Sequence, residues 1–128
     1  MAPVVRDADS LRLSSLAERI AAARDAEPDR GGDSFETEST FTLSSPAPGP
    51  MLTTPPLASH QVAALGIGAA AAKPVAIERE PGEYVVAVHP VGTLALGFDS
   101  GVIDVGYAGH FLDHVRRSLE TRDWMSEL

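Results

Sequence analysis

The stretch Phe98-Asp99-Ser100-Gly101-Val102-Ile103-Asp104-Val105-Gly106 decides the fold, because it joins a β-favouring apolar run to a run with helical periodicity. Residues 93–98 predict a strand that ends at Phe98. We expect Asp104 to be the N-cap of a helix that runs to about residue 120, since its carboxylate suits the positive end of the helix dipole. The apolar residues at helical spacing behind it are Ala108, Phe111, Leu112, Val115 and Leu119. The stretch therefore predicts a strand-to-helix corner.

A second amphipathic helix is expected near the N-terminus. The sequence Ser15-Leu16-Ala17-Glu18 has the form of a capping box, which predicts that the helix starts there, and Pro28 should end it. Its expected buried stripe consists of Leu13, Leu16, Ala17, Ile20 and Ala21.

Four more segments have the composition of strands, and a turn at residues 80–83 joins the last two. These segments are residues 40–44, 62–67, 74–77 and 84–88. With residues 93–98 they predict an α+β fold, in which a mixed, largely antiparallel sheet of about five strands carries two main helices on one face.

We expect residues 1–128 to form a single half-size domain with two long irregular segments. Residues 27–39 are charged and lack apolar periodicity, which is typical of an exposed connector. Residues 45–60 contain five prolines, which exclude a central strand and a helix interior. Loops of this length in compact domains usually have a function or contact a partner.

Composition excludes several functional classes. The 18 acidic and 10 basic residues give a net charge of -8, which disfavours nucleic acid and anionic membranes as partners. The absence of cysteine excludes disulfides, thiolate metal sites and cysteine nucleophiles, and fits a cytoplasmic protein. No signal peptide and no membrane-spanning run is expected. The sequence predicts no cofactor and no metal.

In their order and spacing, several short motifs resemble the catalytic domain of dihydrolipoyl acyltransferases. These enzymes are core subunits of 2-oxoacid dehydrogenase complexes and share the chloramphenicol acetyltransferase fold. The matching motifs are Pro3-Val4-Val5-Arg6-Asp7-Ala8-Asp9, Leu16-Ala17, Thr40-Phe41-Thr42-Leu43-Ser44, Ala64-Leu65-Gly66-Ile67-Gly68, Lys73-Pro74-Val75, Phe98-Asp99 and Phe111-Leu112. The resemblance covers nearly the whole chain, but it corresponds only to the C-terminal half of that domain.

The resemblance implies that the corner has lost its catalyst. The family's turn has the form F-D-H-R-V-I-D-G, in which the histidine is the base of acyl transfer. Here Ser100 stands at the histidine position, Gly101 at the arginine position and Val105 at the last glycine, whereas Asp104 is kept. A serine hydroxyl has no pKa near neutrality and cannot replace a histidine base. Asp104 therefore fits a structural cap better than a catalytic role.

No residue is assigned a catalytic role from the sequence, but a few are candidates. Ser44 matches the family's oxyanion donor, which acts across a subunit boundary, although serine at a strand end is also ordinary. Ser100 as a nucleophile would need a base and an orienting group. His60 and His89 are either displaced bases or surface histidines. The expected substrate-binding residues are Ser44, Ser45, His60, Phe98 and Ser100.

His110 and His114 stand four residues apart on the second helix, so they face the same side. A solvated pair near Asp113 and Arg117 is a better interpretation than a metal site, because the sequence suggests no third ligand.

The sequence predicts a degenerate acyltransferase-like protein, reused as an oligomeric scaffold for binding or assembly. A trimer is favoured, or a complex with a separately encoded chain, because half a sheet leaves an open edge. The pocket would hold an acyl or polyketide-like ligand and act by orientation, in keeping with relatives in secondary metabolism. The alternative is an acyltransferase, from acyl-CoA or acyl carrier to hydroxyl or thiol, completed by a partner chain or a displaced histidine. A third interpretation is a fragment without function beyond folding.

Overall fold

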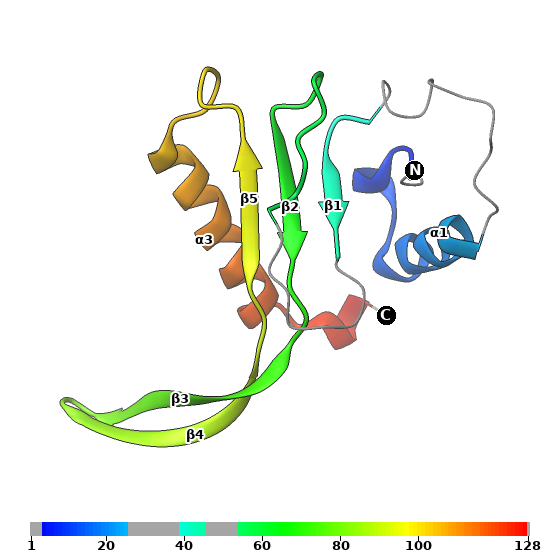
Figure 1. Ribbon diagram of the computed structural model, residues 1–128. Coiled ribbons are helices and arrows are strands. Elements are labelled where there is room, and N and C mark those ends of the chain that lie inside the picture. Colours follow the sequence, from blue (N-terminus) through cyan, green and yellow to red (C-terminus); the bar gives the residue numbers. More distant parts are fainter. Residues whose placement is uncertain (1–3, 26–38, 46–53, 128) are drawn as a thin grey trace. The chain divides into compact units, whose positions relative to one another are not determined.

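The computed structural model describes residues 4–25, 39–45 and 54–127 (Figure 1). Within them the chain is α+β, as predicted, with two main helices and largely antiparallel strands. The elements are η1 (Ala8–Ser10), α1 (Leu13–Asp25), β1 (Thr42–Ser44), β2 (Ala63–Ile67), β3 (Ala71–Glu80), β4 (Glu83–Val91), β5 (Leu94–Phe98), α3 (Val105–Thr121) and η2 (Trp124–Glu127). The connector predicted at residues 27–39 and the first part of the proline-rich loop fall largely outside the described residues.

The chain divides into two compact units. One comprises Met1–Thr40 with Gly109–Leu128, and the other comprises Phe41–Ala108. All five described strands and the corner belong to the second unit.

The five described strands form two sheets, where the sequence predicted one. The larger sheet has the order β1-β2-β5, with β1 parallel to β2 and β5 antiparallel to it. The other consists of β3 and β4 alone. The division arises because β3 follows β2 almost directly and β4 leads almost directly into β5, so the hairpin prolongs the β2–β5 pair instead of lying beside it.

The two faces of the larger sheet differ in side-chain size. Cross-strand neighbours share a face, and the register places Leu43, Leu65 and Leu96 in one row on one face. The other face carries only small residues in its two rows. These rows are Thr42–Ala64–Gly97 and Ser44–Gly66–Ala95.

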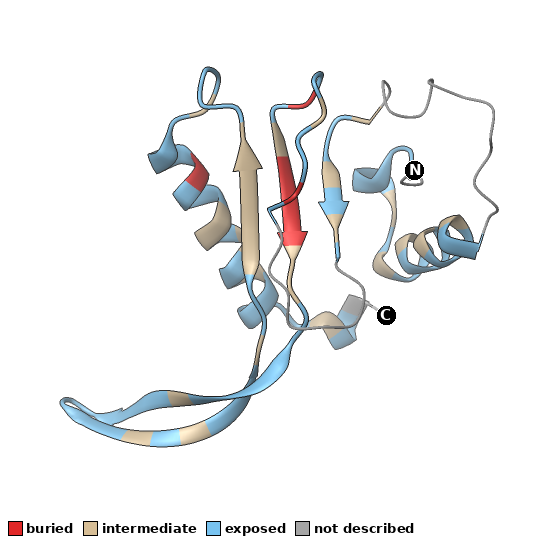
Figure 2. Cartoon of the chain, in the orientation of Figure 1, coloured by how far each residue is buried: buried red, intermediate tan, exposed pale blue. Residues whose placement is uncertain are grey.

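Pro55 packs against the small-residue face. A Cβ added to Gly97 would lie 3.2 Å from the carbonyl oxygen of Pro55 and 3.7 Å from its Cγ. Pro55 is buried, as are Ala64 and Leu65 of β2 (Figure 2). The end of the proline-rich segment therefore lies against this face at β5, an edge strand of the sheet, and glycine at position 97 makes the close approach possible.

Strands β3 and β4 form a long hairpin, which we call the arm. The sequence predicted only residues 74–77 and 84–88 as strands, but the pairing extends from Ala71 opposite Val91 to the turn. Gly82 has a φ of 84° in that turn, a conformation that glycine adopts without strain. The prediction was short because it stopped at the charged residues near the tip and at Pro90, which an edge strand tolerates.

Helix α1 begins earlier than the predicted capping box. The Leu16 N–H donates to the Arg12 carbonyl oxygen at 2.8 Å, so Ser15 already lies inside the helix and cannot be its N-cap. Of the predicted stripe, Ala17 and Ala21 are exposed. The half-buried residues are Leu13, Leu16, Ile20 and Ala23.

Helix α3 is close to its prediction, but only Ala108 of its stripe is buried. Leu112 and Val115 are half-buried, whereas Phe111 and Leu119 are exposed. Behind the helix, the Trp124 Nε1–H donates to the Leu119 carbonyl oxygen at 3.1 Å, so the chain after α3 folds back onto the end of its own helix.

Candidate functional site: the strand-to-helix corner

Asp99 closes the turn between β5 and α3. Its N–H donates to the Val62 carbonyl oxygen at 2.9 Å, which ties the turn to the start of β2. Its carboxylate Oδ1 accepts the Gly101 N–H at 2.8 Å. Its carbonyl oxygen accepts the N–H groups of Val102 at 3.1 Å and Ile103 at 2.9 Å. One aspartate thus fixes the path of the backbone from strand to helix.

Asp104 is the N-cap of α3. Its Oδ1 accepts the Tyr107 N–H at 2.8 Å, and its carbonyl oxygen accepts the Ala108 N–H at 3.1 Å. A Cβ at Gly106 would lie 3.1 Å from the same Oδ1, so glycine leaves room for the capping carboxylate. The cap satisfies one of the helix's orphan donors, and its carboxylate is already engaged in that contact.

Ser100 lies exposed in the turn between these two aspartates. Within the part of the chain that the structure describes, its side chain has no hydrogen-bond partner. A hydroxyl nucleophile needs an adjacent base, and no described side chain fills that role. The corner therefore presents Ser100 as an exposed hydroxyl between Asp99 and Asp104.

The structure brings His60 and Phe98 to the same end of the sheet as Ser100. Phe98, the last residue of β5, pairs with Ala63. His60 lies exposed in the turn just before β2, two residues ahead of Val62, whose carbonyl receives the Asp99 N–H. Three of the predicted substrate-binding residues therefore belong to one end of the sheet.

Ser44 and Ser45 lie toward the other end. Ser44 is the last residue of β1 and shares its row with Ala95. Phe98 lies three positions beyond Ala95 in β5, a distance of about 10 Å at the rise of an antiparallel strand. Ser44 is half-buried and Ser45 is exposed. A single copy of the chain does not bring Ser44 and Ser100 to one reacting centre.

His89 lies on the arm, opposite Lys73. The whole of strand β5 lies along the chain between His89 and the corner, and a five-residue strand is about 16 Å long. The structure therefore does not bring His89 to Ser100.

Gln61, which no sequence pattern singled out, is a buried polar residue near the corner, with 5% of its surface exposed. Its Oε1 accepts the Thr42 hydroxyl at 2.7 Å, and its N–H donates to the Ala58 carbonyl oxygen at 2.9 Å. Gln61 thus fastens β1 to the segment that carries His60. A lone glutamine beside an apolar run has no pattern that predicts this contact.

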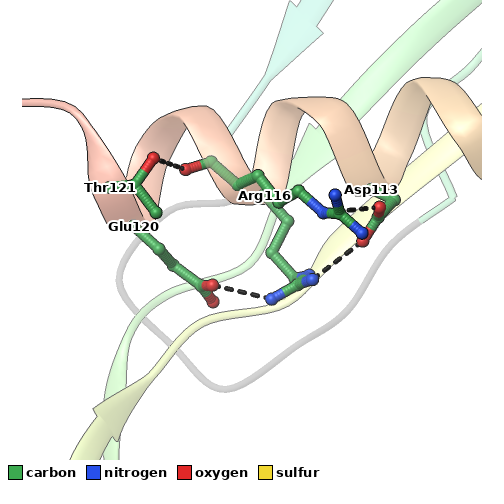
Figure 3. Close-up of polar contacts among 5 residues, drawn as sticks. Asp113, Arg116, Glu120 and Thr121 are labelled. Carbon is green, nitrogen blue, oxygen red and sulfur yellow. Dashed lines mark hydrogen bonds and ion pairs between the residues drawn. The ribbon is translucent and has the colours of Figure 1, made fainter.

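Asp113 forms ion pairs with two arginines (Figure 3). Its Oδ1 lies 2.8 Å from Arg116 Nη2 and its Oδ2 lies 2.9 Å from Arg117 Nε. Arg116 also bridges to Glu120 at 2.7 Å. The hydrogen bond from Arg116, helped by the Arg117 charge, holds the pKa of Asp113 below its ordinary value. The described residues include no cluster of three or more histidine, aspartate or glutamate side chains that would hold a metal ion.

Beside the corner the surface forms an open hollow lined by Val102, Ile103, Asp104 and Tyr107. Tyr107 and Val102 expose most of their side chains.

Among the helices that the structure describes, none has both the length and the apolarity needed to cross a bilayer.

This arrangement of strands, helices and corner defines an α+β domain of the kind found in acyltransferase cores. The structure resembles the cubic core of the pyruvate dehydrogenase multienzyme complex with a TM-score of 0.76 and 28% identity, over 93% of this chain and 48% of that one. It also resembles Azotobacter vinelandii dihydrolipoamide acetyltransferase with a TM-score of 0.73, again at 28% identity and 48% coverage of that chain. Work on that enzyme concerned the roles of a serine, a histidine and an asparagine in its catalytic mechanism.

Residues 1–126 match the family model for the catalytic domain of 2-oxoacid dehydrogenases acyltransferase. The chain belongs to this family. It is 33% identical over 131 residues to the dihydrolipoyllysine-residue acetyltransferase component of the pyruvate dehydrogenase complex of Mycobacterium bovis, covering all of this chain and 24% of that protein. It is 32% identical over 120 residues to the succinyltransferase component of the 2-oxoglutarate dehydrogenase complex of Bacillus subtilis, of which it covers 28%. The chain thus spans about a quarter of the length of these curated relatives.

Proposed function

We propose that this chain is a member of the acyltransferase family that has lost acyl-transfer chemistry and serves as an oligomeric scaffold that binds an acyl ligand. The observation that carries the proposal is that the corner keeps its structural aspartates but lacks the histidine expected of the family. Asp99 and Asp104 hold the turn and the helix start through short hydrogen bonds, while Ser100 stands where the family's base is expected and has no means to take a proton.

The Azotobacter enzyme supports this correspondence. Its histidine and asparagine are four positions apart, the same separation as Ser100 and Asp104. The asparagine position is held here by an aspartate that caps α3, and the histidine position by serine. A corner that keeps its framework while losing its proton-transfer group is expected of a reused scaffold.

The separation of Ser44 from Ser100 supports an oligomer. The resemblance to the family implies that the serine at the position of Ser44 acts across a subunit boundary. Within one copy Ser44 lies about 10 Å along the sheet from the corner end, so a pocket that uses both residues needs two copies. We therefore keep a homo-oligomer, with a trimer favoured, as part of the proposal.

The hollow beside the corner supports a ligand-binding role. Val102, Ile103 and Tyr107 line this hollow within the segment that follows Ser100, and an acyl chain would be held there by burial of apolar area. A polyketide-like ligand has the same apolar chemistry. Such a pocket would act by orienting its ligand, without a covalent or acid-base group.

The proposal is tested by two measurements on the purified chain. The rate of acetyl transfer from acetyl-CoA to dihydrolipoamide should not exceed the uncatalysed rate. The Azotobacter enzyme, assayed in parallel, is the positive control. Calorimetry should detect acetyl-CoA binding that Tyr107→Ala weakens and that Met125→Ala, at an exposed apolar residue of η2 outside the hollow, leaves unchanged. Transfer well above the uncatalysed rate would overturn the loss of chemistry. Equal effects of the Tyr107 and Met125 substitutions would overturn the ligand site.

A second candidate function, an acyltransferase with a displaced base, rests on the position of His60. The turn that carries it adjoins the strand start that binds Asp99, whereas His89 lies on the arm. If the chain transfers acyl groups, His60→Ala should abolish the transfer while His89→Ala leaves it intact. A chain completed by a separately encoded partner would instead become active only when that partner is added.

A further inference from the structure

Gln61 is the one polar residue that is buried among the residues that the structure describes. A buried amide is costly unless it is hydrogen-bonded, so a residue of this type must be held by a partner as well as fill space. A hydrogen bond also fixes a direction, which apolar packing alone does not. Gln61 therefore marks a point where two parts of the fold are joined in one defined arrangement.

Gln61 and Val62 join three parts of the unit that contains the sheet. The Gln61 Oε1 accepts the hydroxyl of Thr42 at 2.7 Å, which fastens the first residue of β1. The Gln61 N–H donates to the Ala58 carbonyl oxygen at 2.9 Å and closes the turn before β2. The carbonyl oxygen of the next residue, Val62, accepts the Asp99 N–H at 2.9 Å. Strand β1, this turn and the corner thus meet at two consecutive residues.

The two segments that meet at this junction, β1 and the corner, have few other backbone contacts within the sheet. Strand β1 has three residues, lies at an edge of its sheet and, among the described strands, pairs only with β2. The Asp99 N–H bond lies one position beyond the Ala63–Phe98 pair, where the pairing of β2 with β5 ends. Segments with few contacts open locally at low free energy. The hydrogen bond between Thr42 and Gln61, which we call the clamp, joins these two segments.

We propose that the clamp couples β1 to the corner, so that the two segments open and close as one unit. A ligand in the hollow beside the corner then stabilises β1, the strand that ends at Ser44. Gln61 is a positioning residue in this arrangement, because it acts through Val62 and Asp99 and does not line the hollow. The effect of a ligand rests on the binding role proposed above, whereas the coupling itself does not.

Native-state hydrogen exchange of the wild type tests the coupling without any substitution. In low urea, the Asp99 amide and the protected amides of β1 should show one free energy of opening and one m-value, because a single opening exposes both. The Ala64 amide, on the central strand β2 opposite Gly97, should open at a higher free energy. Different values for β1 and Asp99, or a value that both share with Ala64, would overturn the unit.

Three variants test the clamp itself. Thr42→Val removes its donor, and Thr42→Ser keeps a hydroxyl. Thr93→Val makes the same change from hydroxyl to methyl at an exposed residue beyond the other end of β5. Exchange of the Asp99 amide should become about tenfold faster in Thr42→Val, the size expected when one partner of a part-buried hydrogen bond is lost. Thr42→Ser should restore the wild-type rate, and Thr93→Val should change it by less than about threefold.

A purely structural role of the clamp gives a different result. If the clamp broke only in global unfolding, Thr42→Val would speed the exchange of the Ala64 amide and leave the local opening of Asp99 unchanged. That outcome would overturn the coupling.

Acetyl-CoA tests whether a ligand in the hollow stabilises β1. At a concentration of about ten times its dissociation constant, a ligand slows exchange from the unit to which it binds by about tenfold. In the wild type, the amides of both Asp99 and β1 should be slowed by this factor. In Thr42→Val only Asp99 should be slowed, because β1 then opens independently of the corner.

These results separate the coupling from the proposed binding role. Binding that protects Asp99 but not β1 in the wild type overturns the coupling and leaves the ligand site standing. A wild type that binds no acetyl-CoA overturns the ligand site, while faster exchange of Asp99 in Thr42→Val still supports the clamp. Equal exchange of Asp99 in Thr42→Val and in the wild type overturns the clamp whether or not acetyl-CoA binds.

Discussion

Replacement of Asp104 tests whether the retained aspartate of the corner is a structural cap. Asp104→Ala removes the acceptor of the Tyr107 N–H bond, which is 2.8 Å long, and leaves that donor at the helix start to solvent. Loss of an N-cap side chain costs about 1 kcal/mol, within a range of roughly 0.5 to 2. Loss of the charge at the positive end of the helix dipole adds about 0.3 to 1 kcal/mol.

Two matched variants divide these contributions. Asp104→Asn keeps an oxygen acceptor and removes the charge, so it should cost only the dipole part, and Asp104→Ser should keep most of the capping bond. The free energy of unfolding is measured by urea titration with a constant m-value. If Asp104→Ala is as stable as the wild type, or Asp104→Asn is as damaging as Asp104→Ala, the capping account of this residue is wrong.

Two further substitutions test the packing and the charges. Gly97→Val places a branched side chain against the Pro55 carbonyl oxygen, which a Cβ alone would approach to 3.2 Å. It should lower the free energy of unfolding, measured by urea titration, by about 1 to 3 kcal/mol. An unchanged urea midpoint would show that Pro55 does not pack against the small-residue face of the sheet. Asp113→Asn should lower helix stability near neutral pH, because Arg116 holds the folded-state pKa of Asp113 below the ordinary 3.8 and the ionised carboxylate therefore favours the folded state. The difference from wild type should disappear as the pH falls through that lowered pKa, and a difference that persists in acid would contradict the ion-pair origin.

The corner was predictable because its signals are local. An aspartate before an amphipathic run predicts an N-cap, and Asp104 fulfils that role. The S-x-x-E pattern at Ser15 was misleading because the same letters fit the interior of a helix, and Arg12 begins the hydrogen bonding of α1 instead. Local pattern identifies that a helix exists better than it locates its first turn.

The arrangement of the candidate site was not predictable, because it depends on pairing between distant strands. Nothing local places Ser44 in the row of Ala95, away from Ser100. The contact between Thr42 and Gln61 likewise joins residues 19 positions apart. The expected single sheet became two because the arm prolongs one strand pair, a matter of register that alternation alone does not determine.

The central claim is that the corner is preserved without its chemistry, and substitution of Ser100 tests it most directly. Acetyl transfer from acetyl-CoA to dihydrolipoamide is measured for the wild type, Ser100→Ala and Ser100→Thr at equal oligomer concentration. The account predicts that all three remain at the uncatalysed rate with unchanged circular dichroism. A wild-type rate well above that background, reduced by about 100-fold or more in Ser100→Ala, would contradict it.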